Sequence, residues 1–141
     1  IGYIIVSPKC TDKDALYAAI CGAGRSLGYI CAPSIFQYMI PHILGLTSDI
    51  NIYKNNASIF YKELSIIGYE VIKPEGAMYL FAKTLIDDDE IFSKKALEYN
   101  LLLVPSTSFG VKGYVRIAYC VKENQIINSI PLFRKLYEYY N

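Results

Sequence analysis

The first third of the chain alternates between apolar segments and short polar interruptions. Residues 1–7 form an apolar run, ended by a proline, that predicts a strand. Thr11 and Asp14 have the spacing of a capping box, which predicts a helix extending to about Gly22. A second, shorter helix is expected over residues 34–44, where apolar side chains recur at helical spacing.

The middle of the chain predicts the longest helix, followed by two strands. Within residues 49–67 the apolar side chains at helical spacing are Ile52, Ile59, Phe60, Leu64 and Ile67. Gly68 follows as a residue suited to the left-handed backbone that ends many helices. Residues 69–74 and 77–83 then have the composition of two strands, joined through a turn that contains proline and glycine.

A helix, two strands and a final helix are expected in the remainder. Asp87 and Glu90 form a capping pattern ahead of a helix that ends at Asn100. Residues 101–104 are all apolar and predict a buried strand. After a polar turn with two glycines, residues 114–121 alternate between two faces and predict another strand.

The last apolar pattern is that of an amphipathic helix. Its apolar positions are Ile126, Ile127, Ile130, Phe133, Leu136 and Tyr137. Pro131 lies within it and lacks a backbone donor, so we expect a kink or a helix start there. The order of elements predicts an α/β protein, more narrowly α+β, with helices packed on one side of a small, mostly antiparallel sheet. The strand at residues 1–7 has no partner nearby in sequence.

Composition narrows the class of partner. The chain has 141 residues, of which 53% are hydrophobic and 19% charged, and its net charge is +1. These values are typical of a folded globular protein, and the interspersed charges favour neither nucleic acid nor a membrane surface as a partner. The apolar run at residues 1–7 is too short for a secretory leader or a membrane span. We therefore expect a cytoplasmic protein.

Three other patterns in the sequence are poor candidates for metal or nucleotide sites. The cysteines and the lone histidine lack the spacing of a zinc site, and we expect reduced thiols, mostly in the core: Cys10, Cys21, Cys31, Cys120 and His42. The glycine-rich residues 21–28 miss the dinucleotide fingerprint by one position and follow no strand. The acidic run at residues 87–90 is better explained by the positive end of a helix dipole than by a metal.

Arg116 is the main candidate for a binding residue. It is one of three arginines beside eleven lysines, and it lies on the strand of residues 114–121. The alternation places Val115, Ile117 and Tyr119 on the core face, so Arg116 points to the opposite face, beside the small Ala118. A planar guanidinium can hold a carboxylate through two parallel hydrogen bonds. Without further information, an ordinary solvated arginine is the simpler interpretation.

A resemblance to a known family changes that balance. The run Pro-Ser-Thr-Ser-Phe-Gly-Val-Lys-Gly-Tyr-Val-Arg-Ile-Ala-Tyr at residues 105–119 resembles the C-terminal signature of class I/II aminotransferases, which have the aspartate aminotransferase fold and use pyridoxal phosphate (PLP). Residues 74–81 resemble that family's Pro-x-Gly-aromatic-Tyr strand, and residues 1–4 resemble the segment after its phosphate-binding arginine. The resemblance implies that Arg116 binds the α-carboxylate of the substrate.

The resemblance covers only the C-terminal portion of such an enzyme. The family's Schiff-base lysine, the aspartate facing the pyridine nitrogen and most phosphate ligands would precede residue 1, so no catalytic, cofactor-binding or metal-binding residue is expected in this chain. Residues 1–48 would be a remnant of the large PLP-binding domain, and residues 49–141 the small domain. The segment alone should be inactive and hold no PLP, and the full-length enzyme is expected to be a homodimer acting on amino acids and 2-oxo acids.

Two alternatives remain open at this level. The chain could be a stand-alone amino-acid-binding regulatory module in which Arg116 holds an effector carboxylate. It could also belong to a PLP lyase or decarboxylase, because one fold hosts several chemistries. Ser106 and Ser108 could line the cleft or serve only in the turn. Arg25 is a conceivable second cation for a distal carboxylate, with no spacing argument behind it.

Overall fold

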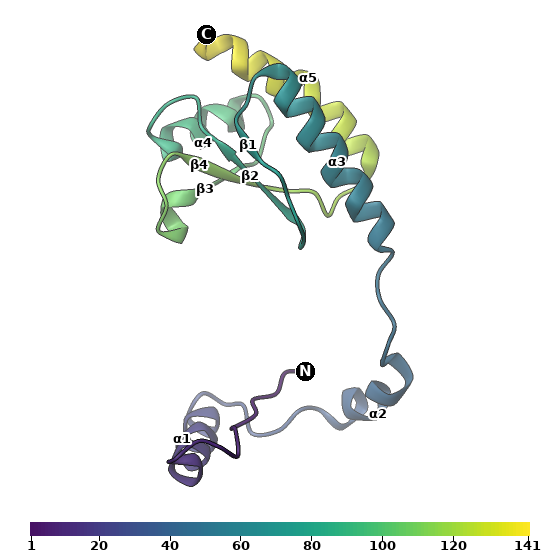
Figure 1. The fold of residues 1–141 in the computed structure, drawn as a ribbon, viewed down its shortest axis with the longest axis vertical. Helices are drawn as coiled ribbons and strands as arrows, with labels where there is room; N and C mark the ends of the chain where they lie inside the picture. Colours follow the sequence, from purple (N-terminus) through teal and green to yellow (C-terminus); the bar gives the residue numbers. More distant parts are fainter. The chain divides into compact units, whose positions relative to one another are not determined.

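The computed structural model describes residues 1–141 as two compact units, Ile1–Thr47 and Ser48–Asn141 (Figure 1). The first unit holds helices α1 (Lys13–Ser26) and α2 (Ser34–Ile43), neither of which has a buried residue. The division lies next to the boundary expected from the sequence. The origin of residues 1–48 in a larger domain stays a prediction.

Three expectations for the first unit are corrected. Residues 1–7 form no strand, because a strand needs a neighbour and residues 1–47 offer none. The capping box expected at Thr11 does not form. Asp12 is the residue that precedes α1, and its side chain makes no cap hydrogen bond. The same helix continues through the glycine-rich stretch to Ser26, and Gly28, with φ of 86°, follows its end.

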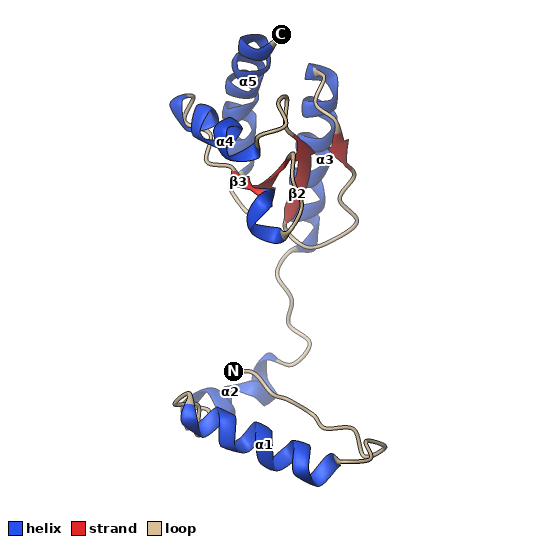
Figure 2. Cartoon of the chain, turned by 90° about the vertical axis from the view of Figure 1, so that its left-hand side faces the viewer, coloured by secondary structure: helices blue, strands red, loops and turns tan.

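The second unit is a four-stranded antiparallel sheet with three helices. Its strands are β1 (Val71–Ile72), β2 (Tyr79–Lys83), β3 (Val104–Pro105) and β4 (Tyr114–Ala118), arranged in the order β1-β2-β4-β3. Its helices are α3 (Ile50–Ile67), α4 (Asp89–Glu98) and α5 (Glu123–Tyr140), and a 3₁₀ turn, η1 (Ser106–Phe109), follows β3. Helices α3 and α5 pack side by side (Figures 1 and 2). The predicted fold class is confirmed.

The core lies against one face of the sheet. Leu80 and Ala82 on β2, and Val115 and Ile117 on β4, are each at most 4% exposed. They share a single cluster with the buried residues of the three helices, which include Phe60, Leu64, Phe92, Ala96, Ile126, Phe133 and Leu136. The predicted alternation of β4 is therefore confirmed. The side chains between these positions, including Arg116, point to the face that no helix of this unit covers.

Helix α3 follows its sequence pattern with two exceptions, the first of which is Ile52, which is 54% exposed. Asp49 caps it by accepting a hydrogen bond from the Asn51 backbone N–H at 3.0 Å. Phe60, Leu64 and Ile67 are buried as expected, but the stripe also contains Asn56, which is 1% exposed. The Asn56 Nδ2 donates to the backbone oxygens of residues 119 and 121, at 2.9 and 2.8 Å. This buried amide ties the helix to the chain that leaves β4.

Two other elements differ from expectation. Residues 101–104 are not one buried strand: pairing begins at Val104, and Leu102 is 84% exposed. Only Val104 and Pro105 pair with β4, and in the extended segment before them alternate side chains point to opposite sides, so Leu101 and Leu103 are buried while Leu102 is not. Helix α5 continues through Pro131 without interruption. The alternative that a helix starts at that proline is therefore wrong.

Candidate functional site

Arg116 contacts two aromatic rings on the uncovered face of the sheet. Its guanidinium carbon is 4.3 Å from the centre of the Tyr79 ring and 4.6 Å from that of Phe109. Tyr79 comes from β2 and Phe109 ends the η1 turn, so three separate segments build this arrangement. Both distances are within the range of cation–π attraction, which holds the guanidinium against the two rings.

The guanidinium has no carboxylate partner within the chain. The two ion pairs of the structure join Lys83 to Glu70 and Lys95 to Glu98, and no side-chain hydrogen bond reaches Arg116. A guanidinium carries five N–H donors around its edge. No hydrogen bond or ion pair within the chain uses these donors of Arg116. The half-buried side chain is thus not consumed by a structural ion pair, and a guanidinium in that state can still bind a planar anion.

A second aromatic pair extends this surface. Phe81 lies directly opposite Arg116 in the β2–β4 register, and its ring stacks on that of Tyr114 at 5.4 Å with an interplanar angle of 14°. The sheet face around the arginine is therefore largely aromatic. Apolar surroundings lower the local dielectric constant and strengthen hydrogen bonds to a bound carboxylate.

The turn before β4 is held by a buried carboxylate. Asp89, which is 2% exposed, accepts hydrogen bonds from the Ser106 hydroxyl at 2.8 Å, the Thr107 backbone N–H at 2.8 Å and the Thr107 hydroxyl at 2.7 Å. The Ser106 Oγ in turn accepts from the Tyr114 backbone N–H at 3.0 Å. Burial by itself would raise the pKa of Asp89, but the hydrogen bonds from Thr107 and Ser106 outweigh it and lower that pKa.

The hydrogen bonds around this turn can be compared with two predictions, one for the cap of α4 and one for Ser106 and Ser108. The helix cap is one residue later than expected, because Asp88 rather than Asp87 accepts the Ile91 backbone N–H, at 2.9 Å. Ser106 is fully buried and serves the turn, and Ser108 bonds back to the Pro105 carbonyl at 2.9 Å. The sequence did not predict the contact between Asp89 and the turn, because residue spacing contains no signal for a hydrogen bond between positions so far apart.

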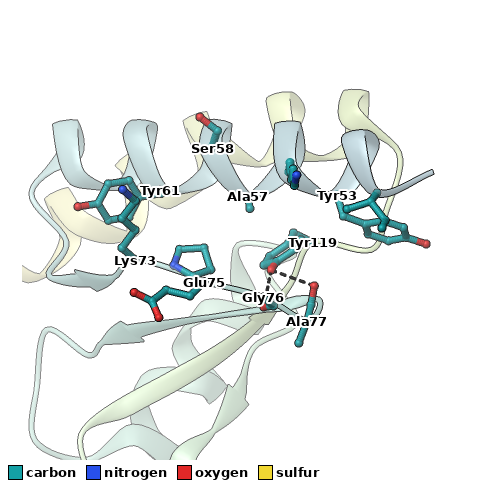
Figure 3. Close-up of a pocket in the computed structure, with 12 residues that line it drawn as sticks. Tyr53, Ala57, Ser58, Tyr61, Lys73, Glu75, Gly76, Ala77 and Tyr119 are labelled. Atoms are coloured by element: carbon teal, nitrogen blue, oxygen red, sulfur yellow. Dashed lines mark hydrogen bonds between the residues drawn. The ribbon is translucent and has the colours of Figure 1, made fainter. Parts of the chain in front are cut away.

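A cleft of about 350 Å³ lies on the other side of β4, between α3 and the loop at residues 73–77 (Figure 3). The phenol of Tyr119 donates to the carbonyls of Gly76 and Ala77, at 3.0 and 3.1 Å, and thereby fixes this loop. Ala77 has a φ of 60°, a left-handed conformation that is uncommon for a residue with a side chain. Burial raises the pKa of the Tyr119 phenol, which therefore stays protonated as a donor. Arg116 does not line this cleft.

No group of three or more histidine, cysteine and acidic side chains is placed to hold a metal ion. All four cysteines are free, but none is buried, so the expectation that most lie in the core is wrong. Cys120 is exposed two residues after the end of β4, and the other three belong to residues 1–47, where no core closes. No helix of the chain has the length and apolar character needed to cross a membrane.

Comparison with known proteins gives consistent matches. The sequence model of the family "Aminotransferase class I and II" matches residues 37–130. A crystal structure of an amino transferase from Eubacterium rectale is 51% identical to this chain, covers 99% of it and superposes with a TM-score of 0.92. A probable aspartate aminotransferase of Methanocaldococcus jannaschii is 26% identical over 98% of the chain. The (5-formylfuran-3-yl)methyl phosphate transaminase of the same organism is 31% identical over 84% of it.

These relatives are much longer than the chain. The chain spans 38% and 32% of the two Methanocaldococcus jannaschii proteins and 35% of the Eubacterium rectale structure. About a third of each relative is therefore represented by these 141 residues.

Proposed function

Because the chain belongs to the class I and II aminotransferase family, we propose that it is the C-terminal part of a PLP-dependent enzyme. That enzyme exchanges an amino group between an amino acid and a 2-oxo acid. In the proposed division, residues 1–48 belong to the large domain and residues 49–141 form the small domain. The proposal also includes a homodimeric full-length enzyme.

The role proposed for this chain is to hold the α-carboxylate of the substrate through Arg116. The observation that carries the proposal is a guanidinium that lies 4.3 and 4.6 Å from the centres of the Tyr79 and Phe109 rings and whose N–H edge has no hydrogen bond or ion pair within the chain. A carboxylate can meet that edge through two parallel hydrogen bonds, which fixes its plane as well as its position. Restricting a substrate in this way contributes to catalysis by orientation rather than by bond chemistry.

The bond chemistry belongs to the cofactor. PLP supplies an electron sink that stabilises negative charge at the substrate α-carbon. The residues of this chain do not fit the cofactor's own requirements: no lysine is buried, and the most shielded one, Lys95, is paired with Glu98 at 2.7 Å. We therefore propose that the cofactor-linked lysine lies in another part of the protein, and that the 141-residue chain alone is inactive.

Replacement of Arg116 by lysine in the complete protein tests the proposal. An ammonium group keeps the charge but cannot form the paired hydrogen bonds or fill the space between two rings. We expect a higher KM for the amino acid and a lower kcat, with kcat/KM falling by about 100-fold if roughly 3 kcal/mol of charge-assisted binding is lost. Reaction with the corresponding amine, which lacks only the α-carboxylate, should be unaffected.

Arg134 provides the matched control. It is an exposed arginine on α5 with no hydrogen bond or ion pair, so Arg134→Lys should leave both kinetic constants unchanged. Equal kinetics for Arg116→Lys and the parent enzyme would refute the carboxylate-binding role.

The two alternative functions differ in their support. A stand-alone regulatory module has no specific observation in its favour, since nearly the whole chain superposes on part of a much longer aminotransferase. Both Methanocaldococcus jannaschii relatives are named as aminotransferases or transaminases, not as lyases or decarboxylases. Their names support the proposed reaction. The proposed substrates are amino acids as a class, because every amino acid carries the α-carboxylate that Arg116 would hold.

A further inference from the structure

Asp89 is the buried acid whose partners all lie far away in the sequence. It belongs to the first turn of α4, yet it does not cap that helix, because Asp88 performs this function. Both Asp89 oxygens instead accept hydrogen bonds from Ser106 and Thr107, at 2.7–2.8 Å. A carboxylate with 2% exposure keeps its charge only when hydrogen bonds replace the lost water, and three such bonds are present here.

Two structural links lead from these partners to Arg116. Ser106 and Thr107 belong to η1, the turn that ends in Phe109, and the Phe109 ring contacts the guanidinium at 4.6 Å. The Ser106 Oγ also accepts the backbone N–H of Tyr114, two residues before the arginine on the same strand. The Asp89 carboxylate therefore restrains Phe109, one of the two rings that contact Arg116. It also restrains the start of the strand that carries the guanidinium.

We propose that Asp89 is a positioning residue for substrate binding, acting through the η1 turn and Phe109 to hold Arg116 in its carboxylate-binding orientation. The inference rests on the proposed role of Arg116 and extends it to a residue that does not itself face the substrate. The Phe109 ring is 48% exposed, so core packing alone does not fix it. Its position depends on the turn, and the turn depends on the buried carboxylate.

Substitution of Asp89 by asparagine in the complete protein disrupts this network. The amide keeps one acceptor oxygen but places an N–H₂ group opposite a donor from the turn. We expect KM for the best amino-acid donor, selected from the twenty common amino acids, to rise by about 10- to 100-fold, the range expected for a displacement near 1 Å. Asp87→Asn is the matched control, because Asp87 is exposed and its side chain makes no hydrogen bond to the turn, whereas all three of these bonds go to Asp89.

A double-mutant cycle separates positioning from general destabilisation. The effect of Asp89→Asn on KM is measured in the parent enzyme and again in the Arg116→Gln background, with thermal unfolding followed in parallel. If Asp89 acts through the arginine, its effect on KM should largely disappear once the guanidinium is gone. An equal rise of KM in both backgrounds would overturn the inference, as would a lower melting temperature with unchanged KM.

A milder variant keeps the test decisive if Asp89→Asn fails to fold. Thr107→Val removes one of the three hydrogen bonds but keeps the backbone N–H bond, whereas Thr107→Ser keeps all three. KM should rise for Thr107→Val and stay close to the parent value for Thr107→Ser. If KM for Thr107→Val matches that for Thr107→Ser, the inference fails. If Arg116→Gln alone leaves KM unchanged, the proposed function itself fails, which is a distinguishable result.

Discussion

Gly68 is a position where the structure predicts a large cost for a single methyl group. Its φ of 120° lies in a region that residues with a side chain rarely adopt. A Cβ at this position would also lie 2.5 Å from the Oη and 2.7 Å from the Cζ of Tyr137. The Tyr137 ring cannot easily withdraw, because it packs against Tyr69 at 5.3 Å, and the Tyr69 phenol is bonded to the Phe133 carbonyl at 2.9 Å.

Two separate costs add at this site for Gly68→Ala. The backbone conformation costs about 1–2 kcal/mol once a Cβ is present. Forcing the methyl group against a packed aromatic ring costs about another 1–3 kcal/mol. The free energy of unfolding should therefore fall by about 2–5 kcal/mol, a large part of the roughly 5–15 kcal/mol typical of a folded domain. For a domain of this size the melting temperature should fall by about 10–30 °C.

Two other glycines separate these costs. Gly110 has a φ of 80° but open space around its Cβ, so Gly110→Ala should show the conformational cost alone. Gly76 has neither a positive φ nor a neighbour within 4 Å, so Gly76→Ala should be close to neutral. In a Tyr137→Ala background the cost of Gly68→Ala should shrink to that of Gly110→Ala.

The measurement is urea-induced unfolding followed by circular dichroism, with midpoints and slopes compared across the set. The expected order of midpoints is Gly76→Ala highest, Gly110→Ala intermediate and Gly68→Ala lowest. Equal midpoints for Gly68→Ala and Gly110→Ala would refute the contact with Tyr137. Equal midpoints for all three would refute the backbone argument as well.

Two further predictions concern acid stability and the cofactor. Because the pKa of Asp89 is lowered in the folded state, the folded protein binds a proton at this carboxylate less readily than the unfolded chain does. The contribution of Asp89 to stability is therefore present above about pH 4 and is lost as the pH falls through the folded-state pKa. Urea midpoints between about pH 5 and about pH 2.5 should therefore decline less steeply for Asp89→Asn than for the parent chain; identical slopes would contradict the assignment. The 141-residue chain should retain no PLP after gel filtration and show no transaminase activity, because its lysines are solvent-accessible or paired with acids; stoichiometric PLP retained in the visible spectrum would contradict this.

Local sequence patterns predicted the helices and the faces of the central strand. Leu64 and Ile67 are buried at helical spacing, and Val115 and Ile117 are buried at alternate positions. Such periodicities follow from backbone geometry, which repeats every 3.6 residues in a helix and every two in a strand. The same alternation placed Arg116 on the outer face, as the structure has it.

Strand lengths could not be predicted in the same way. Residues 69–74 and 101–104 have strand composition, yet only two residues pair in each of β1 and β3. A strand is defined by its neighbours, and both of these are edges of the sheet. The apolar run at residues 1–7 forms no strand within this chain for the same reason: composition favours extension, but pairing needs a partner.

The sequence by itself determined which residues are capable of chemistry: one arginine on the outer face of a strand, and an acidic run at a helix start. Tertiary structure alone decided their surroundings. Packing of β2, β4 and η1 brings the rings of Tyr79 and Phe109 against Arg116, across 37 and 7 positions of sequence. It also buries Asp89 against a turn 17 residues away. Contacts between distant segments depend on how whole elements pack, and the local periodicity of a sequence contains no record of that packing.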